Sequence, residues 1–266
     1  MWTHYHIVET QEELAGLLSL REGKAKIVSG GTDLMVEMQN GKWQDLEDVI
    51  DISRVQGWDK IWLDAEGVVH IDALVTHNDV LQSKLLREYG APLVQTCYKV
   101  ASPQLRNRAT VVGNLVTASP ANDTITPLMG MDASLTLRSV RGERVVSLKD
   151  FYLGVRKTML EADEFVKEIT FKGLPPETRS VFLKTALRKA QAIATLNVCV
   201  IARFEGEQIV EAAVTLGSVS PIIMHAAEAE ALLTGKVITD ELAKQAGTLA
   251  AEAAVPISDV RGSDAY

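Results

Sequence analysis

Residues 27–34 of the sequence, Ile27-Val28-Ser29-Gly30-Gly31-Thr32-Asp33-Leu34, place two adjacent glycines between a short apolar strand pattern and the start of a helical pattern. Paired glycines at such a junction let the backbone approach a diphosphate closely, with amide N–H groups pointing toward it. The hydroxyl of Thr32 adds a further donor. A tight turn in which Thr32 or Asp33 serves as the helix N-cap explains the same residues. The sequence leaves both interpretations open.

A second turn-rich stretch is Thr110-Val111-Val112-Gly113-Asn114-Leu115-Val116-Thr117-Ala118-Ser119-Pro120-Ala121-Asn122-Asp123. Its hydroxyl and amide side chains can donate and accept hydrogen bonds, which suits a polyhydroxylated ligand or the edge of a heteroaromatic ring. The alternative is a polar loop that its own Asx and Ser/Thr turns stabilise. The stretch has about 14 residues, more than most connections need, and this length slightly favours the ligand interpretation.

Charged residues outside these two stretches have simpler interpretations. Lys184 lies within an otherwise apolar strand pattern, where its ammonium group could face an anion in a cleft, although a head group in solvent is the commoner case. Glu161, Asp163 and Glu164 cluster on what we expect to be a solvated loop. They are therefore not interpreted as a paired acid and base.

Length and composition limit the class of protein. The chain has 266 residues, of which 47% are apolar, enough for one large domain or two small ones with a sizeable core. A net charge of −8 argues against a general nucleic-acid binder. Cys97 and Cys199 are too few for an iron–sulfur cluster or a disulfide framework in this chain. With no signal pattern at the start and no apolar run long enough for a bilayer, we expect a cytoplasmic protein without a membrane span.

Several catalytic signatures are absent from the sequence. It has no G-x-G-x-x-G after a strand pattern, no G-x-x-x-x-G-K-[ST] loop and no G-x-S-x-G elbow. Its five histidines show no metal-ligand spacing. Nothing therefore indicates a hydrolase or a metal site, and we assign neither a catalytic residue nor a metal ligand.

The pattern of helices and strands indicates an α+β protein. Thr10 and Glu13 form a capping-box pattern ahead of a helix, and residues 79–89 and 92–100 also read as helices. Residues 172–177, which include Pro175-Pro176, are the best linker candidate. Beyond it, residues 193–204 and 208–216 predict a hairpin, and residues 225–233 and 239–254 predict two helices.

Taken in order, these stretches resemble the FAD-binding (medium) subunit of the xanthine dehydrogenase family of molybdenum hydroxylases, including the flavoprotein subunit of aerobic carbon monoxide dehydrogenase. The resemblance covers nearly the whole chain. It rests on residues 30–34, 102–107, 110–123, 154–158, 182–188, 217–221 and 258–263. It implies a PCMH-type (vanillyl-alcohol-oxidase-like) FAD-binding domain at 1–173, with subdomains of about 1–55 and 56–173. A small C-terminal α/β domain of the carbon monoxide dehydrogenase flavoprotein type is implied at 177–266.

The resemblance also implies which residues contact FAD. The first glycine loop would hold the diphosphate, and the second would hold more of the diphosphate and the flavin side. Val166 would pack against the flavin, and Lys184 would lie beside the flavin ring, where its charge would raise the reduction potential. The implied cofactor-binding residues are Ile27, Val28, Ser29, Gly30, Gly31, Thr32, Asp33, Leu34, Thr110, Gly113, Asn114, Thr117, Asp123, Val166 and Lys184.

By the same resemblance, the chain is an electron-transfer subunit that is active only within a complex. A small subunit with 2Fe–2S clusters and a large subunit with the molybdenum cofactor (molybdopterin) would be its partners, in a dimer of heterotrimers. Val112 departs from the family's second loop, where glycine is usual, and Gln191-Ala192 replace acidic residues, which weakens the case for NAD as acceptor. Two alternatives are a self-sufficient flavin oxidase of the same fold and an interaction module that has lost its flavin.

Overall fold

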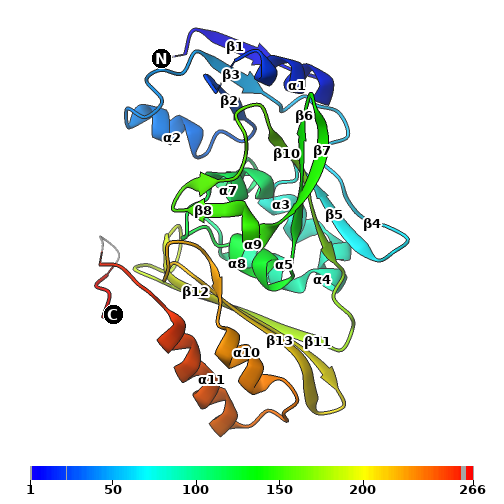
Figure 1. Ribbon diagram of the computed structural model, residues 1–266, viewed down its shortest axis with the longest axis vertical. Helices are drawn as coiled ribbons and strands as arrows, with labels where there is room; N and C mark the ends of the chain where they lie inside the picture. Colours follow the sequence, from blue (N-terminus) through cyan, green and yellow to red (C-terminus); the bar gives the residue numbers. More distant parts are fainter. Residues whose placement is uncertain (1, 22, 259–261, 266) are drawn as a thin grey trace.

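The computed structural model describes residues 2–21, 23–258 and 262–265, which form three successive units (Figure 1). Residues 259–261 of the stretch 258–263 lie outside the described residues, as do Met1, Glu22 and Tyr266. Helices and strands are mixed throughout, and the predicted α+β class is therefore confirmed.

The N-terminal unit is a parallel sheet with the strand order β1-β3-β2. Its helix α1 begins at the predicted capping box, in which the Thr10 hydroxyl accepts the N–H of Glu13 and the Glu13 carboxylate accepts the N–H of Thr10, both at 3.2 Å. Leu14 and Leu18 on this helix are buried, as the apolar stripe predicts. The elements are β1 (His4–Ile7), α1 (Gln11–Ser19), β2 (Ala25–Val28), α2 (Leu34–Gln39) and β3 (Asp48–Asp51).

The middle unit is an antiparallel sheet with the order β4-β5-β10-β6-β7, covered by short helices. Its strands are β4 (Ile61–Leu63), β5 (Val68–Asp72), β6 (Ser134–Ser139), β7 (Gly142–Ser147) and β10 (Phe165–Lys172), and β8 (Tyr152–Gly154) and β9 (Lys157–Thr158) form a small separate pair. The helices are α3 (His77–Gln82), α4 (Lys84–Tyr89), α5 (Ala91–Lys99), α6 (Pro103–Arg106), α7 (Val111–Thr117), α8 (Ile125–Gly130) and α9 (Leu148–Phe151).

One predicted helix of the middle unit is divided in two. The pattern at residues 79–89 suggested a single helix, but Ser83 adopts an extended conformation (ψ 117°) between α3 and α4. Its hydroxyl accepts the N–H of Leu86 at 3.1 Å and so caps α4. A serine that can bond locally to the backbone favours such a helix start over a helix interior.

The C-terminal unit is an antiparallel sheet with the order β11-β12-β13-β14 and two helices on one face. The predicted hairpin is confirmed: β12 and β13 pair from Asn197–Gly217 to Glu205–Gln208, and Gly206 supplies the positive φ (+61°) of the turn. The helix predicted at residues 225–233 begins two residues later, at Ala227, because Met224 and His225 form the short strand β14. The elements are β11 (Thr178–Ala186), β12 (Ala194–Glu205), β13 (Gln208–Gly217), β14 (Met224–His225), α10 (Ala227–Leu233) and α11 (Asp240–Ala253).

The side chain of Gln95 on α5 joins the middle unit to the outer edge of β11. Its amide group donates to the carbonyl of Ser180 at 3.2 Å, and its carbonyl accepts the N–H of Phe182 at 3.0 Å. Gln95 therefore bonds to β11 as a residue of a neighbouring strand would.

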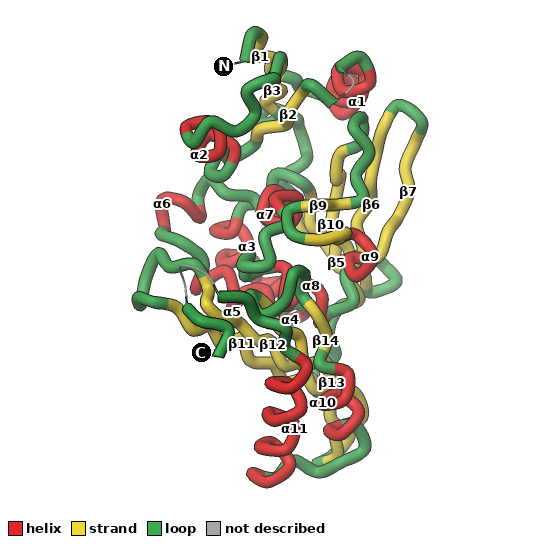
Figure 2. The backbone as a smooth tube through the Cα atoms, turned by 60° about the vertical axis from the view of Figure 1, so that its left-hand side comes forward, coloured by secondary structure: helices red, strands yellow, loops and turns green. Residues whose placement is uncertain are grey.

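Two hydrophobic cores result from this arrangement. The larger runs through the N-terminal and middle units and includes Phe182 and Ile201 of the C-terminal sheet. The smaller lies between β12, β13 and the helices α10 and α11, with Val214 and Leu233 among its members. Figure 2 shows α7 at mid-height, between the N-terminal sheet above and α10 and α11 below.

Candidate functional site

A cleft of about 720 Å³ lies between the N-terminal and middle units. Its volume is within the range of about 300–1,000 Å³ that is usual for small-molecule and cofactor sites. One part of its wall is formed by the two glycine-bearing loops, and another by apolar side chains such as Leu14, Leu18 and Phe165. The predicted residues that line it are Ile27, Val28, Ser29, Gly30, Gly31, Thr32, Asp33, Leu34, Thr110, Gly113, Asn114, Thr117 and Val166.

Gly30 of the first glycine-bearing loop packs against the backbone of Arg108 and Ala109, directly before the second loop. A Cβ atom on Gly30 would lie 1.9 Å from the carbonyl oxygen of Arg108, so no larger residue fits there. The hydroxyls of Ser29 and Thr110 lie 3.2 Å apart and link the loops by a hydrogen bond. Gly31 follows with φ +73°, a backbone conformation that favours glycine. The first loop therefore presents backbone without side chains at Gly30 and Gly31, and it is fixed beside the cleft by these contacts.

The tight-turn interpretation of the first loop accounts for only part of this geometry. Asp33 occupies the N-cap position of α2, but its side chain makes no capping hydrogen bond. Partial desolvation by the surrounding residues raises the pKa of the Asp33 carboxyl, and Arg156 partly offsets this effect. Asp33 is exposed and lines the cleft without capping α2, so the turn interpretation leaves the position of its carboxylate unexplained.

The second loop is stabilised by its own hydrogen bonds and also lines the cleft. The Thr110 hydroxyl accepts the N–H of Gly113 at 3.0 Å and caps α7, and the Thr117 hydroxyl donates to the carbonyl of Gly113 at 2.9 Å. Asn114 is oriented by Thr124, whose hydroxyl donates to Asn114 Oδ1 at 2.5 Å. This bond leaves the amide nitrogen of Asn114 as a donor for a ligand. The loop is therefore stabilised by its own turns, as the second interpretation has it, and it also lines the cleft.

Asp123 and Lys184 lie outside the lining of the cleft and form a buried ion pair. Lys184 Nζ is 2.5 Å from Asp123 Oδ2, and the two side chains are only 8% and 7% exposed. Asn197 donates to the other oxygen of Asp123 at 3.1 Å. Burial raises the pKa of Asp123, against the opposing effect of Lys184. Of the two interpretations of Lys184, the solvated head group does not hold, and the anion that its ammonium group faces within this chain is Asp123.

A cluster around Glu37 at the cleft was not predicted from the sequence. Arg156 Nη1 lies 2.6 Å from Glu37 Oε1, and the Trp43 indole N–H donates to Glu37 Oε2 at 2.9 Å. The ammonium of Lys26 lies 3.9 Å from the centre of the Trp43 ring, and burial lowers its pKa. Trp43 and Arg156 have φ values of +61° and +56°, which few non-glycine residues adopt. Such strained conformations are usual at ligand sites.

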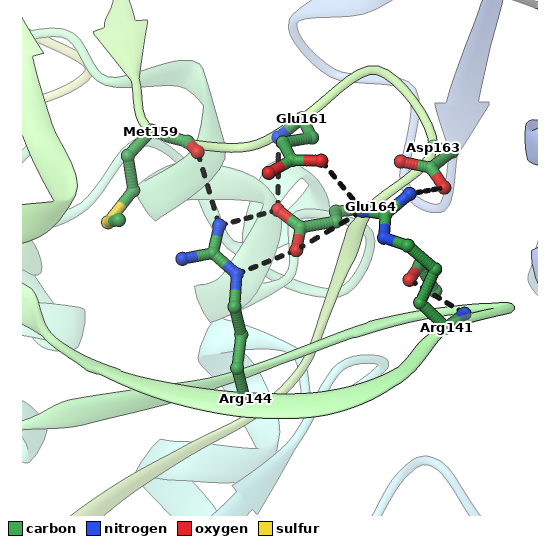
Figure 3. Close-up of polar contacts among 7 residues, drawn as sticks. Arg141, Arg144, Met159, Glu161, Asp163 and Glu164 are labelled. Carbon is green, nitrogen blue, oxygen red and sulfur yellow. Dashed lines mark hydrogen bonds and ion pairs between the residues drawn. The ribbon is translucent and has the colours of Figure 1, made fainter.

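The apolar part of the cleft is bounded by the loop at residues 159–164, between β9 and β10. Figure 3 shows the polar contacts of this loop. Glu164 on this loop is 4% exposed at its side chain and is held by the guanidinium of Arg144 through two bonds of 2.7 Å. These bonds lower the pKa of Glu164. The loop was expected to be solvated. That interpretation is wrong for Glu164 but holds for Glu161, whose side chain is 61% exposed.

Two further observations concern the described residues as a whole. They contain no group of three or more His, Cys, Asp or Glu side chains placed to hold a metal ion. None of their helices is both long and apolar enough to cross a membrane.

Comparison with known proteins finds two family models along the chain. The model for the FAD binding domain in molybdopterin dehydrogenase matches residues 2–171, and the model for the CO dehydrogenase flavoprotein C-terminal domain matches residues 181–266. The nicotinate dehydrogenase FAD-subunit of Eubacterium barkeri is 33% identical over 88% of this chain and 80% of its own length. The carbon monoxide dehydrogenase medium chain of Hydrogenophaga pseudoflava is 28% identical over 98% of this chain and 90% of its own.

Solved structures agree with these matches. A carbon monoxide dehydrogenase structure from Hydrogenophaga pseudoflava aligns with a TM-score of 0.95 and 28% identity, covering 100% of this chain and 92% of that chain. Quinoline 2-oxidoreductase from Pseudomonas putida 86 aligns with a TM-score of 0.92 and 26% identity, covering 100% and 90%. The resemblance and the FAD-binding fold that it implied are therefore confirmed. The chain belongs to the FAD-binding medium subunits of the molybdenum hydroxylases, the oxidoreductase family of xanthine and carbon monoxide dehydrogenases.

Proposed function

We propose that this chain holds FAD in the cleft between its N-terminal and middle units and transfers electrons within a molybdenum hydroxylase complex. The observation that carries the proposal is the close approach of the first glycine-bearing loop to the backbone just before the second, with Gly30 against the carbonyl of Arg108 at the wall of a cofactor-sized cleft. Bare backbone beside a cleft lets amide N–H groups reach a diphosphate without a side chain between them.

The groups that line the cleft fit a dinucleotide cofactor. Ser29, Thr32 and Thr117 offer hydroxyls, and Asn114 offers its amide nitrogen. Lys26 adds positive charge on the same wall, which favours a doubly charged diphosphate, whereas the charge of Arg156 is largely balanced by Glu37 at 2.6 Å. The apolar part of the cleft, where Val166 lies beside Phe165, suits a flat aromatic ring. The predicted loop residues would thus hold the diphosphate, and Val166 would contact a ring.

Asp123 and Lys184 would reach the cofactor where it extends beyond the cleft. Because the carboxylate of Asp123 is 2.5 Å from the ammonium of Lys184, the two charges largely cancel at a distance. The pair would therefore raise the reduction potential of a nearby ring less than an isolated lysine would. When bound, FAD supplies the exchange between one-electron and two-electron transfer.

The complex itself is part of the proposal. A subunit with 2Fe–2S clusters would deliver electrons, a large subunit would carry the molybdenum cofactor, and an external acceptor would receive the electrons, in a cytoplasmic dimer of heterotrimers. The relatives compared above are named as an FAD-subunit and a medium chain, which fits a chain that works with others. We place the two domains at 1–173 and 177–266, on either side of Pro175-Pro176.

The test is the uptake of FAD by the purified chain, followed by reduction. Absorbance bands at about 370 and 450 nm, typical of flavins, and a released cofactor with the mass of FAD are expected. The isolated chain should not be bleached by substrates of related hydroxylases, whereas the complex reconstituted with its partner subunits should be. A chain that stays colourless with added FAD, alone and in the complex, would refute the proposal. Bleaching of the isolated chain would indicate a self-sufficient oxidase instead.

A further inference from the structure

The loop at residues 159–164 is the starting point of this inference. Leu160, Glu161 and Ala162 line the cleft, and the loop ends at Glu164, which lines it too. The peptide groups of Leu160 and Ala162 make no hydrogen bond with any part of the chain that the structure describes. Backbone donors and acceptors beside apolar side chains can bond to the edge of a heteroaromatic ring.

This loop is fixed from one side by Arg144 of β7. Besides its two bonds to Glu164, the guanidinium of Arg144 donates to the carbonyl of Met159 at 3.4 Å. Glu164 in turn accepts the N–H of Glu161 at 3.0 Å. Figure 3 shows these bonds closing a ring through Met159, Arg144, Glu164 and Glu161. The first and last residues of the loop are thus tied to the same guanidinium.

A second arginine, Arg141, also contacts the loop at 159–164 but contributes less to fixing it. Arg141, at the turn between β6 and β7, pairs with Glu161 at 2.7 Å and with Asp163. Its side chain is 53% exposed, and exposed ion pairs contribute little. The pair of Arg144 with Glu164 is bidentate, and the Glu164 side chain is only 4% exposed, which makes this pair the stronger anchor although the Arg144 side chain is 38% exposed.

On its other side the loop reaches the N-terminal unit. Ala162 lies so close to Gly23 that a Cβ on Gly23 would be 3.6 Å from the Cβ of Ala162. The loop therefore spans from the sheet of the middle unit to the turn before β2, and it encloses the apolar part of the cleft. No residue of the glycine-bearing loops takes part in these contacts.

We infer that Arg144 and Glu164 are positioning residues, which fix the loop at 159–164 as the wall against which one heteroaromatic ring of FAD lies. The inference rests on the proposed function. Neither side chain needs to react, because their effect reaches the ring through the peptide groups of Leu160 and Ala162. The two rings of FAD, adenine and isoalloxazine, share this chemistry, and the experiment below distinguishes them.

The experiment measures the dissociation constants of FAD, ADP and FMN for the full chain by calorimetry. The variants are Arg144→Met, which removes the anchor, Arg144→Lys, which keeps the charge, and Glu164→Gln, which keeps the acceptor for the N–H of Glu161. Arg203→Met is the matched control, because Arg203 makes the same kind of bidentate pair, with Glu211, far from the cleft on β12. Far-UV circular dichroism reports whether each variant is folded.

The expected result is that Arg144→Met weakens FAD binding about 10-fold, as for the loss of a charge-assisted pair, while Arg203→Met does not. Only one of the two halves, ADP or FMN, should lose affinity, and that half identifies the ring against the loop. Arg144→Lys and Glu164→Gln should lie between wild type and Arg144→Met. The inference is overturned, while the proposed function stands, if Arg144→Met loses affinity equally for ADP and FMN, or if a folded Arg144→Met loses no affinity for FAD. A wild-type chain that binds no FAD overturns the proposed function and the inference with it.

Discussion

Gly30 lies so close to Arg108 that a Cβ atom on the glycine would come within 1.9 Å of the arginine's carbonyl oxygen. The neighbouring atoms are backbone, which cannot rotate away as a side chain could. Any substitution here must therefore move the first glycine-bearing loop away from the backbone at Arg108 and disturb the adjacent bond between Ser29 and Thr110.

Gly30→Ala is accordingly expected to abolish FAD uptake and to lower the free energy of unfolding by about 1–3 kcal/mol, as overpacking does. Gly16→Ala is the control, since Gly16 lies in α1 with no atom within 4 Å of an added Cβ. It should be neutral or stabilising by up to about 1 kcal/mol. Urea unfolding and flavin absorbance measure both effects. Normal FAD binding by the Gly30→Ala variant would show that the loop contact is not needed.

The buried pair of Asp123 and Lys184 predicts strong coupling in a double-mutant cycle. Asp123→Asn leaves the ammonium of Lys184 buried without its counter-ion, which typically costs about 3–5 kcal/mol. Combining it with Lys184→Met removes both charges and should cost less than the sum of the single changes. Denaturant titration of the four chains gives the coupling energy. Simple additivity would mean that the two charges do not interact in solution.

The Glu37 cluster predicts an effect on FAD release with little effect on stability. Arg156→Met removes the ion pair between α2 and the β8–β9 turn, and the Arg156 side chain is 45% exposed. Its loss should change the free energy of unfolding by less than about 1 kcal/mol. The rate of FAD release should rise several-fold, because α2 is then no longer tied across the cleft. Stopped-flow fluorescence after dilution measures that rate. Lys167→Met, which breaks an ion pair with Glu143 away from the cleft, should leave it unchanged.

The pair of His225 and Glu230 predicts a pH-dependent stability. The Glu230 carboxylate, 2.7 Å from His225 Nδ1, raises the pKa of His225 above its ordinary 6.5, and Asp132 adds to this. A raised folded-state pKa gives stability that is complete below about pH 6.5 and is lost as the pH rises through the raised value. The melting temperature of the wild type should therefore fall relative to that of His225→Gln above about pH 6.5. Parallel curves for the two proteins would contradict the prediction.

Features set by residues near one another in the sequence could be predicted. The capping box of Thr10 and Glu13 involves a spacing of three residues, and the hairpin turn at Gly206 is equally local. The glycine-bearing loops were also recognisable, because closely approached backbone admits few residue types, as Gly30 and Gly113 show. The family resemblance then linked the two loops, which no local pattern could do.

Features that depend on distant partners could not be predicted. Glu37 and Arg156 are 119 residues apart, and nothing in either local pattern indicates the other. Glu164 and Arg144 are 20 residues apart, and a row of acidic residues looks solvated until a guanidinium is placed beside it. Ser83 divides a helix because its hydroxyl competes with the helical backbone, whereas the apolar periodicity runs through it unchanged.

The hydrogen bonds of Gln95 to the edge of β11 have a consequence for folding during synthesis of the chain. An uncovered strand edge invites pairing with other chains and hence aggregation. Gln95 precedes Ser180 by 85 residues. During synthesis, the residue that bonds to the edge of β11 therefore leaves the ribosome well before β11 itself. Synthesis from the N-terminus thus brings β11 out beside a partner that has already had time to fold. The C-terminal sheet made by itself would emerge without that cover, and the soluble yield of such a fragment should be poor.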